Sequence, residues 1–174
     1  MSETNQIPQY VRMHQVGAAP MTKGDFHSRV KNDPQMLSAE EAGQEGYVVH
    51  YPDGYVSWCP KAQFEAAGRP IDGMTFGMAI EAMKRGRRVA RKGWNGKGMY
   101  LWLLPAAEVK KEWCKDTRLI EAMGERDTLP CLGAIRMFTA TREVLTGWLA
   151  SQTDMLAEDW MILADDSTPN QVAP

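Results

Sequence analysis

Hydrophobic positions along this chain fall into short runs with two different periods. Residues 46–70, GYVVHYPDGYVSWCPKAQFEAAGRP, contain two aromatic and β-branched runs on either side of Pro52-Asp53-Gly54, a strong turn signal. They predict a hairpin of residues 47–51 and 55–58. A short helix, KAQFEAAG, is predicted to follow Pro60 and to end at Gly68. Because an isolated hairpin is marginal in water, we expect this element to dock on another part.

A helical period follows Ile71-Asp72-Gly73, which we interpret as a linker. In MTFGMAIEAMKRG, Thr75 is a candidate N-cap and Gly86 stands where a C-terminal glycine is expected. The apolar positions that share one face of this predicted helix are Phe76, Ala79, Ile80 and Met83.

The rest of the chain predicts an antiparallel sheet. Residues 87–91 and 99–104 resemble two strands joined by KGWNGKG, and AIRMFTA and VLTGWLAS form a second hairpin around residues 141–143. Residues 105–130 have helical composition but a weak period, as expected for an excursion from the sheet.

A capping-box spacing of Ser151 and Asp154, with Asp in place of the usual Glu, predicts a short helix that ends near Glu158. The run WMIL is then the last strand. The predicted class is α+β: a small antiparallel β-sheet packed with an N-terminal helix and a short C-terminal helix, preceded by a β-hairpin–helix element. The predicted parts are a polar arm (1–45), the hairpin–helix element (46–72), an α+β domain (73–164) and a disordered tail (165–174).

Charge is unevenly distributed along a chain whose net charge is only −2. Residues 74–118 carry a net charge of +7, and the parts before and after carry −3 and −6. A basic middle suits an anionic ligand, and it equally suits charge pairing within or between subunits. The three widely spaced Cys resemble reduced cytosolic thiols, and no run of apolar residues is long enough to cross a bilayer.

Motifs favour binding over catalysis. The sequence has no GxSxG, P-loop or dinucleotide fingerprint, and its three His show no metal-binding spacing. We therefore expect no catalytic residue, no metal and no cofactor. The alternative of a nucleic-acid binder that uses the basic segment is disfavoured by the acidic net charge.

The Gly-flanked loop KGWNGKG leaves two interpretations open. Trp94 can stack on a nucleobase, Asn95 can hydrogen-bond a base or ribose edge, and Arg91 and Lys92 can balance phosphate charge. Alternatively, Trp94 is a hydrophobic plug in a tight turn. Ser151, Gln152 and Thr153, at a predicted helix start, likewise form either an anion site or a plain cap between two core Trp residues.

Three motifs together resemble a known phage family. FGMAIEAMKRG, VARKGWNGKGMYLWL and WLASQTDMLAEDW occur in that order, and residues 74–163 resemble the second type of Thoeris anti-defence protein. The resemblance implies a sponge that holds a cyclic ADP-ribose-type signal, such as glycocyclic ADP-ribose, intact in the host cytoplasm. It also implies tetramers with ligand pockets between subunits, and in some members a separate site for cyclic dinucleotides.

The matching motifs supply the candidate ligand-binding residues. Together with those from the loop and helix start they are Arg91, Trp94, Asn95, Tyr100, Trp148, Ser151, Gln152, Thr153 and Asp154. Residues 46–70 resemble a recurrent phage accessory element, YPDGYxSWxPKxxFE, for which we infer no activity. The rival hypotheses are a hydrolase or lyase that degrades such a signal, and a phage structural or interaction module.

Overall fold

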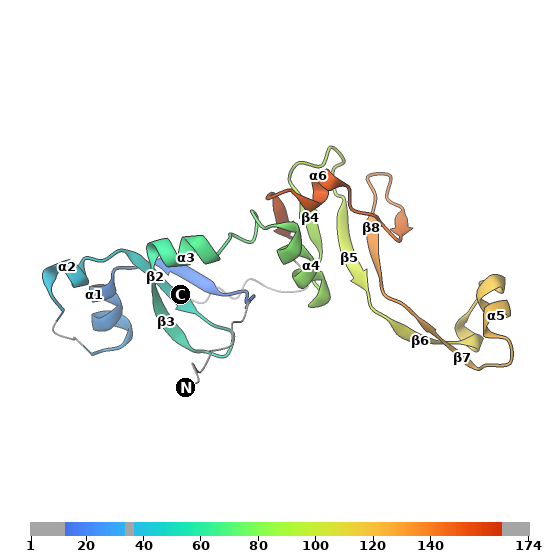
Figure 1. Cartoon of the computed structure of the whole chain (residues 1–174), viewed down its shortest axis with the longest axis horizontal. Helices are drawn as coiled ribbons and strands as arrows, with labels where there is room; N and C mark the ends of the chain where they lie inside the picture. Colours follow the sequence, from blue (N-terminus) through green and yellow to red (C-terminus); the bar gives the residue numbers. More distant parts are fainter. Residues whose placement is uncertain (1–12, 34–36, 165–174) are drawn as a thin grey trace, which may run out of the picture. The chain divides into compact units, whose positions relative to one another are not determined.

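The computed structural model describes residues 13–33 and 37–164, and these divide into two compact units, Met1–Arg69 and Pro70–Pro174. The predicted α+β class is confirmed, because the described residues combine several helices with sheets whose strand pairs are all antiparallel (Figure 1). Within the described residues, no helix is long and apolar enough to span a membrane. The predicted tail at 165–174 lies outside the described residues.

The first unit is built on a three-stranded sheet in the order β1-β2-β3. Its strands are β1 (Gly17–Pro20), β2 (Gly46–His50) and β3 (Val56–Pro60), and β2 and β3 form the hairpin predicted around Pro52-Asp53-Gly54. Its helical segments are α1 (Lys23–Asp25), the π-helix η1 (Phe26–Val30), α2 (Ala39–Ala42) and α3 (Lys61–Ala67).

The first unit has a small core formed by η1, β2 and α3. Phe26, Val48 and Val49 are buried, and Tyr47 stacks on Phe64 of α3 with ring centroids 4.4 Å apart. The hairpin–helix element therefore docks on β1, which pairs with β2 and belongs to the residues predicted as a polar arm.

The second unit contains a five-stranded sheet in the order β10-β4-β5-β8-β9. Its strands are β4 (Val89–Arg91), β5 (Tyr100–Leu104), β8 (Ala134–Phe138), β9 (Val144–Thr146) and β10 (Trp160–Ile162). The predicted helix is confirmed as α4 (Phe76–Lys84), with Thr75 as its N-cap and Gly86 at a φ of +80° just after its end. Buried α4 residues Ala79, Ala82 and Met83 pack with Val89, Leu101 and Met137 of the sheet.

Residues 105–133 extend β5 and β8 into an arm (Figure 1). Strands β6 (Ala107–Lys110) and β7 (Thr128–Cys131) pair in it, and the segment between them forms the 3-10 turn η2 (Lys111–Trp113) and helix α5 (Thr117–Met123). The excursion is thus confirmed. Its helical composition forms η2 and α5, but residues 107–110 are a strand because β6 pairs with β7.

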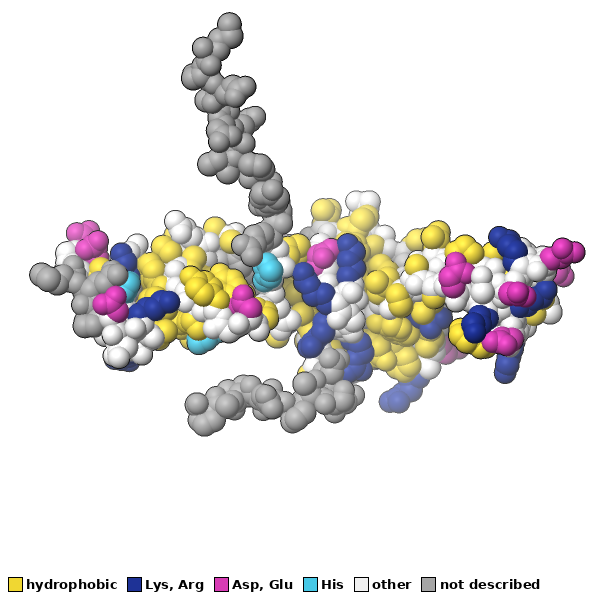
Figure 2. Space-filling view, turned by 90° about the horizontal axis from the view of Figure 1, so that it is seen from below, with side chains coloured by type: hydrophobic (Ala, Val, Ile, Leu, Met, Phe, Trp, Pro, Cys, Tyr) yellow, Lys and Arg dark blue, Asp and Glu magenta, His cyan; other side chains and the backbone are white. Residues whose placement is uncertain are grey.

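Three predicted boundaries are wrong. The first strand begins at Val89 and not at 87, and β9 ends at Thr146 because the N–H groups of Gly147 and Trp148 both bond to the Ile135 carbonyl. Helix α6 (Gln152–Met155) stops before Glu158, because the Ala157 N–H turns back to the carbonyl of Asp154. In Figure 2, hydrophobic side chains lie beside Lys and Arg side chains on the second unit, as the basic middle of the sequence suggests.

Candidate functional site

The predicted capping box forms at the start of α6. The Ser151 hydroxyl accepts a hydrogen bond from the Asp154 N–H, and the Asp154 carboxylate accepts one from the Ser151 N–H at 3.1 Å. The Ser151 hydroxyl also lies 2.6 Å from the same carboxylate oxygen, Oδ2. One oxygen of Asp154 is therefore fully used in holding the first turn of α6.

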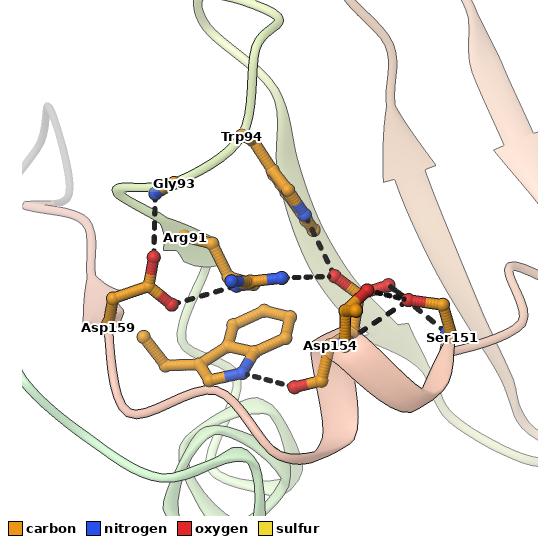
Figure 3. A network of polar contacts seen from close by, with 8 residues as sticks. Arg91, Gly93, Trp94, Ser151, Asp154 and Asp159 are labelled. Carbon is orange, nitrogen blue, oxygen red and sulfur yellow. Dashed lines mark hydrogen bonds and ion pairs between the residues drawn. The ribbon is translucent and has the colours of Figure 1, made fainter.

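Arg91 connects the other oxygen of Asp154 to a second carboxylate. Its Nη1 lies 2.8 Å from Asp154 Oδ1, and its Nε lies 2.8 Å from Asp159 Oδ1 (Figure 3). The remaining Asp159 oxygen accepts the Gly93 N–H at 2.7 Å. A largely buried guanidinium thus ties the end of β4 to α6 and to the residue before β10.

Trp94 is anchored in this network by its indole. The Trp94 Nε1–H donates to Asp154 Oδ1 at 3.1 Å, and the ring meets Trp160 edge to face with centroids 5.5 Å apart. Trp148 contacts both rings, and Phe76 of α4 completes the aromatic cluster. The fully buried Trp160 donates its own indole N–H to the Asp154 carbonyl at 2.9 Å.

These contacts fix the charge of the network. Burial raises the pKa of Asp154, but hydrogen bonds from Ser151, Arg91 and Trp94 outweigh it and lower the pKa to about 2. The hydrogen bond from Arg91 is the main cause that lowers the pKa of Asp159. Both carboxylates are therefore ionised at neutral pH, with Arg91 as their shared cation.

Exposed polar groups surround the rigid frame formed by Arg91, Trp94 and Asp154, and we call these groups the rim. Because Trp94 bonds to Asp154, the loop of residues 92–98 lies next to the start of α6. Asn95 and Lys97 of the loop and Gln152 and Thr153 of α6 are exposed. Amide, ammonium and hydroxyl groups on a fixed backbone suit the hydroxyl and phosphate groups of a polar ligand.

The structure brings together most of the residues predicted for the site. Arg91, Trp94, Ser151, Thr153 and Asp154 lie in one polar network, and Trp148 packs on its rings. Asn95 and Gln152 are at its exposed rim. Tyr100 lies apart, because it neighbours the inward-facing Leu101 on β5 and so points to the opposite face of the sheet.

Two residues central to the network were not among the predicted site residues. Asp159 and Trp160 lie 68 and 69 positions beyond Arg91, and only the fold brings them together. The sequence signal that could have identified Asp159 is its place in the same motif as Asp154, as a second carboxylate five positions later. In the described parts of the chain, no group of three or more His, Cys, Asp or Glu side chains is arranged to hold a metal ion.

Comparisons with known proteins match the unit that contains this network. A family model described as Tad2-like, a Thoeris anti-defense 2-like domain, matches residues 74–163. A protein named Thoeris anti-defense 2, from Bacillus phage SP01, is 36% identical over 91 residues, which cover 52% of this chain and 96% of that protein. The match begins at Met74, one residue before the α4 cap, so the first unit lies outside it.

Proposed function

This chain belongs to the Thoeris anti-defense 2-like family, and we propose that it counters Thoeris by binding and sequestering a cyclic nucleotide-derived signal without cleaving it. Family membership supports the anti-Thoeris function itself. The proposal adds the mode of action and the ligand class, which is that of glycocyclic ADP-ribose, with cyclic dinucleotides as a further possibility. It places this activity in the host bacterial cytoplasm.

The observation that carries the proposal is the rigid frame of Arg91, Trp94 and Asp154 beneath an exposed polar rim. A sequestering protein needs a site that is already ordered before the ligand arrives, because ordering side chains on binding reduces affinity. The network orders the loop and α6 through bonds within the protein and leaves the side chains of Asn95, Lys97 and Gln152 available for a ligand.

The state of Asp154 favours binding over hydrolysis. A general base works best with a pKa near the operating pH, whereas the Asp154 pKa is about 2 and both of its carboxylate oxygens already accept hydrogen bonds. Asp159 is likewise paired with Arg91 and the Gly93 N–H. Neither carboxylate is disposed to take a proton from water, and this disfavours the rival hydrolase hypothesis.

Exposed apolar side chains support assembly into a homo-oligomer, for which we propose a tetramer. Leu149 and Leu156, which flank α6, are 88% and 79% exposed, and Val144 on the edge strand β9 is 55% exposed. Apolar side chains beside an unpaired strand edge favour contact with another protein surface. In such an assembly, α6 and the adjoining rim would lie close to a neighbouring subunit.

Calorimetric titration of the full chain with glycocyclic ADP-ribose tests the proposal. Variants Asn95→Ala and Lys97→Gln remove exposed rim groups, so they are expected to weaken binding by about ten-fold each while leaving the folded structure unchanged, as for one lost hydrogen bond to a charged or polar ligand group. Gln63→Ala, an exposed substitution on α3 of the first unit, is the matched control. Absence of binding by folded wild-type protein would contradict the proposal.

A further inference from the structure

One face of the five-stranded sheet carries no helix in the described part of the second unit. Helix α4 packs on the face that bears Val89, Leu101 and Met137, and α6 is joined to that same face through Arg91. Successive residues of a strand point to opposite sides. Residues adjacent to these therefore form the opposite face, which we call the open face.

Aromatic side chains of the two central strands form the middle of the open face. Tyr100 of β5 lies directly opposite Phe138 of β8, and their rings stack with centroids 5.2 Å apart at an angle of 21°. Trp102, two residues along β5, lies 5.5 Å from the Tyr100 ring. Trp102 has this one ring neighbour among the described residues and is half-buried, so part of its indole surface is accessible for stacking.

Arg136 stands directly opposite Trp102 on β8. Its Nε is buried and has no hydrogen-bond partner, and the guanidinium forms no ion pair with a described residue. Arg88, which precedes β4, lies with its guanidinium carbon 5.3 Å from the centre of the Tyr100 ring. No strand residue that shares this face is Asp or Glu.

A half-buried Arg that has no counter-ion among residues 13–33 and 37–164, beside an indole, is suited to an anionic, planar partner. A guanidinium binds phosphate through several parallel N–H donors, and an aromatic face stacks on a nucleobase. A second copy of the same face is a poorer partner, because face-to-face packing would bring the Arg136 side chains of both copies close together, and no strand residue of this face is acidic.

We propose that the open face binds single-stranded nucleic acid, with a base stacked on Trp102 and the adjacent phosphate held by Arg136. Aromatic side chains on the central strands of a small antiparallel sheet are a recurrent way to bind unpaired bases. The +7 net charge of residues 74–118 supplies the surrounding attraction for a polyanion, despite the acidic chain as a whole.

This inference is independent of the proposed signal site. Arg91 and Trp94 belong to the helix-covered side of β4, whereas Trp102 and Arg136 belong to the open face. A variant that loses signal binding can therefore still be tested for nucleic-acid binding, and a variant that loses nucleic-acid binding can still be tested for signal binding.

Fluorescence anisotropy of a labelled oligothymidylate with the full chain, measured over a series of salt concentrations, tests the proposal. Trp102→Leu is expected to weaken binding by at least about five-fold, the lower end of what one stacked base contributes. Arg136→Gln is expected to weaken binding and to reduce the slope of log K against log salt by about one, as for one lost phosphate contact. If Trp102→Leu does not fold, the change in this slope for Arg136→Gln still tests the proposal.

Arg118→Gln is the matched control, since it removes the same charge from an exposed side chain on α5. Four results would overturn the proposal: no binding by folded wild-type protein at low salt, equal losses in the Arg136 and Arg118 variants, or equal affinity for polyphosphate, which has no bases. The fourth is a Trp102→Leu variant that changes the mass of the assembly in light scattering but not the oligonucleotide affinity. That result would assign the open face to contacts between copies.

Discussion

The indole N–H of Trp94 donates to the carboxylate of Asp154, at 3.1 Å and across 60 positions of the chain. The same carboxylate oxygen accepts Arg91, and the other oxygen accepts Ser151. Trp94 is thus a structural member of the loop as well as a neighbour of the exposed rim. A substitution at Trp94 would disturb both the folded loop and the exposed rim. Substitutions at neighbouring residues are needed to separate the structural role from ligand binding.

Asp154→Asn is expected to lower the free energy of unfolding of the second unit by about 2–3 kcal/mol, since it weakens hydrogen bonds between charged groups that are largely buried. Urea unfolding followed by Trp fluorescence measures this loss. Asp72→Asn is the control, because the Asp72–Lys92 ion pair is more than half exposed on both sides. The control is expected to change stability by less than about 0.5 kcal/mol, and an equal loss in both variants would contradict a structural role for the network.

The low pKa of Asp154 makes stability depend on pH in acid. Because the folded pKa is about 2 and the ordinary value is 3.8, the stabilisation is present above about pH 4 and is lost as pH falls toward 2. The difference in pKa corresponds to about 2 kcal/mol. Urea unfolding of the wild type and of Asp154→Asn at pH 5 and pH 2.5 measures it. The difference in free energy of unfolding between the two proteins should be smaller at pH 2.5 than at pH 5. An equal difference at both pH values would contradict the low pKa of Asp154.

Two Gly→Ala substitutions are expected to act in opposite directions. Gly77 is exposed on α4, where an added Cβ meets only an ordinary contact with Thr75 at 3.9 Å, so Gly77→Ala should stabilise the protein by about 0.5–1 kcal/mol. A Cβ on Gly93 would lie 2.7 Å from the Asp159 carboxylate. Gly93→Ala should therefore destabilise the protein by about 1–2 kcal/mol, comparable to a lost hydrogen bond to a charged group. Thermal unfolding of both variants measures whether each substitution raises or lowers stability. Stabilisation by Gly93→Ala would show that the contact between Gly93 and Asp159 is not retained in solution.

Much of the local structure was predictable because its signals are local. The turn at Pro52-Asp53-Gly54, the Thr75 cap and the Ser151–Asp154 capping box each involve residues within four positions, and each forms as predicted. The β6–β7 ribbon was not predictable in this way. Its Val109 pairs with Leu129, and the intervening composition favours helix.

The site shows the same division between local and long-range signals. The motifs identified the residues, but the hydrogen bond from Arg91 to Asp159 spans 68 positions, and no spacing rule predicts it. The question whether Trp94 is a turn plug or a stacking platform was also undecidable from sequence, because its contacts with Trp148 and Trp160 exist only in the folded unit.

The proposed assembly depends on the exposed leucines beside α6. Leu156→Glu is expected to reduce the mass of the assembly in light scattering, because it places a charge in an apolar contact. It should leave the unfolding of the second unit unchanged, since Leu156 is 79% exposed. Gln63→Glu, with the same added charge in the first unit, is the control. An unchanged mass in Leu156→Glu would remove α6 from the interface.

Recovery of the bound signal tests the central claim most directly. The purified full chain is loaded with glycocyclic ADP-ribose, freed of unbound ligand and heated until it unfolds, and the released small molecules are identified by mass spectrometry. The account predicts that the signal is retained by the folded protein and returned chemically intact after prolonged incubation. Release of a cleaved or altered product would contradict sequestration and establish the rival enzymatic function.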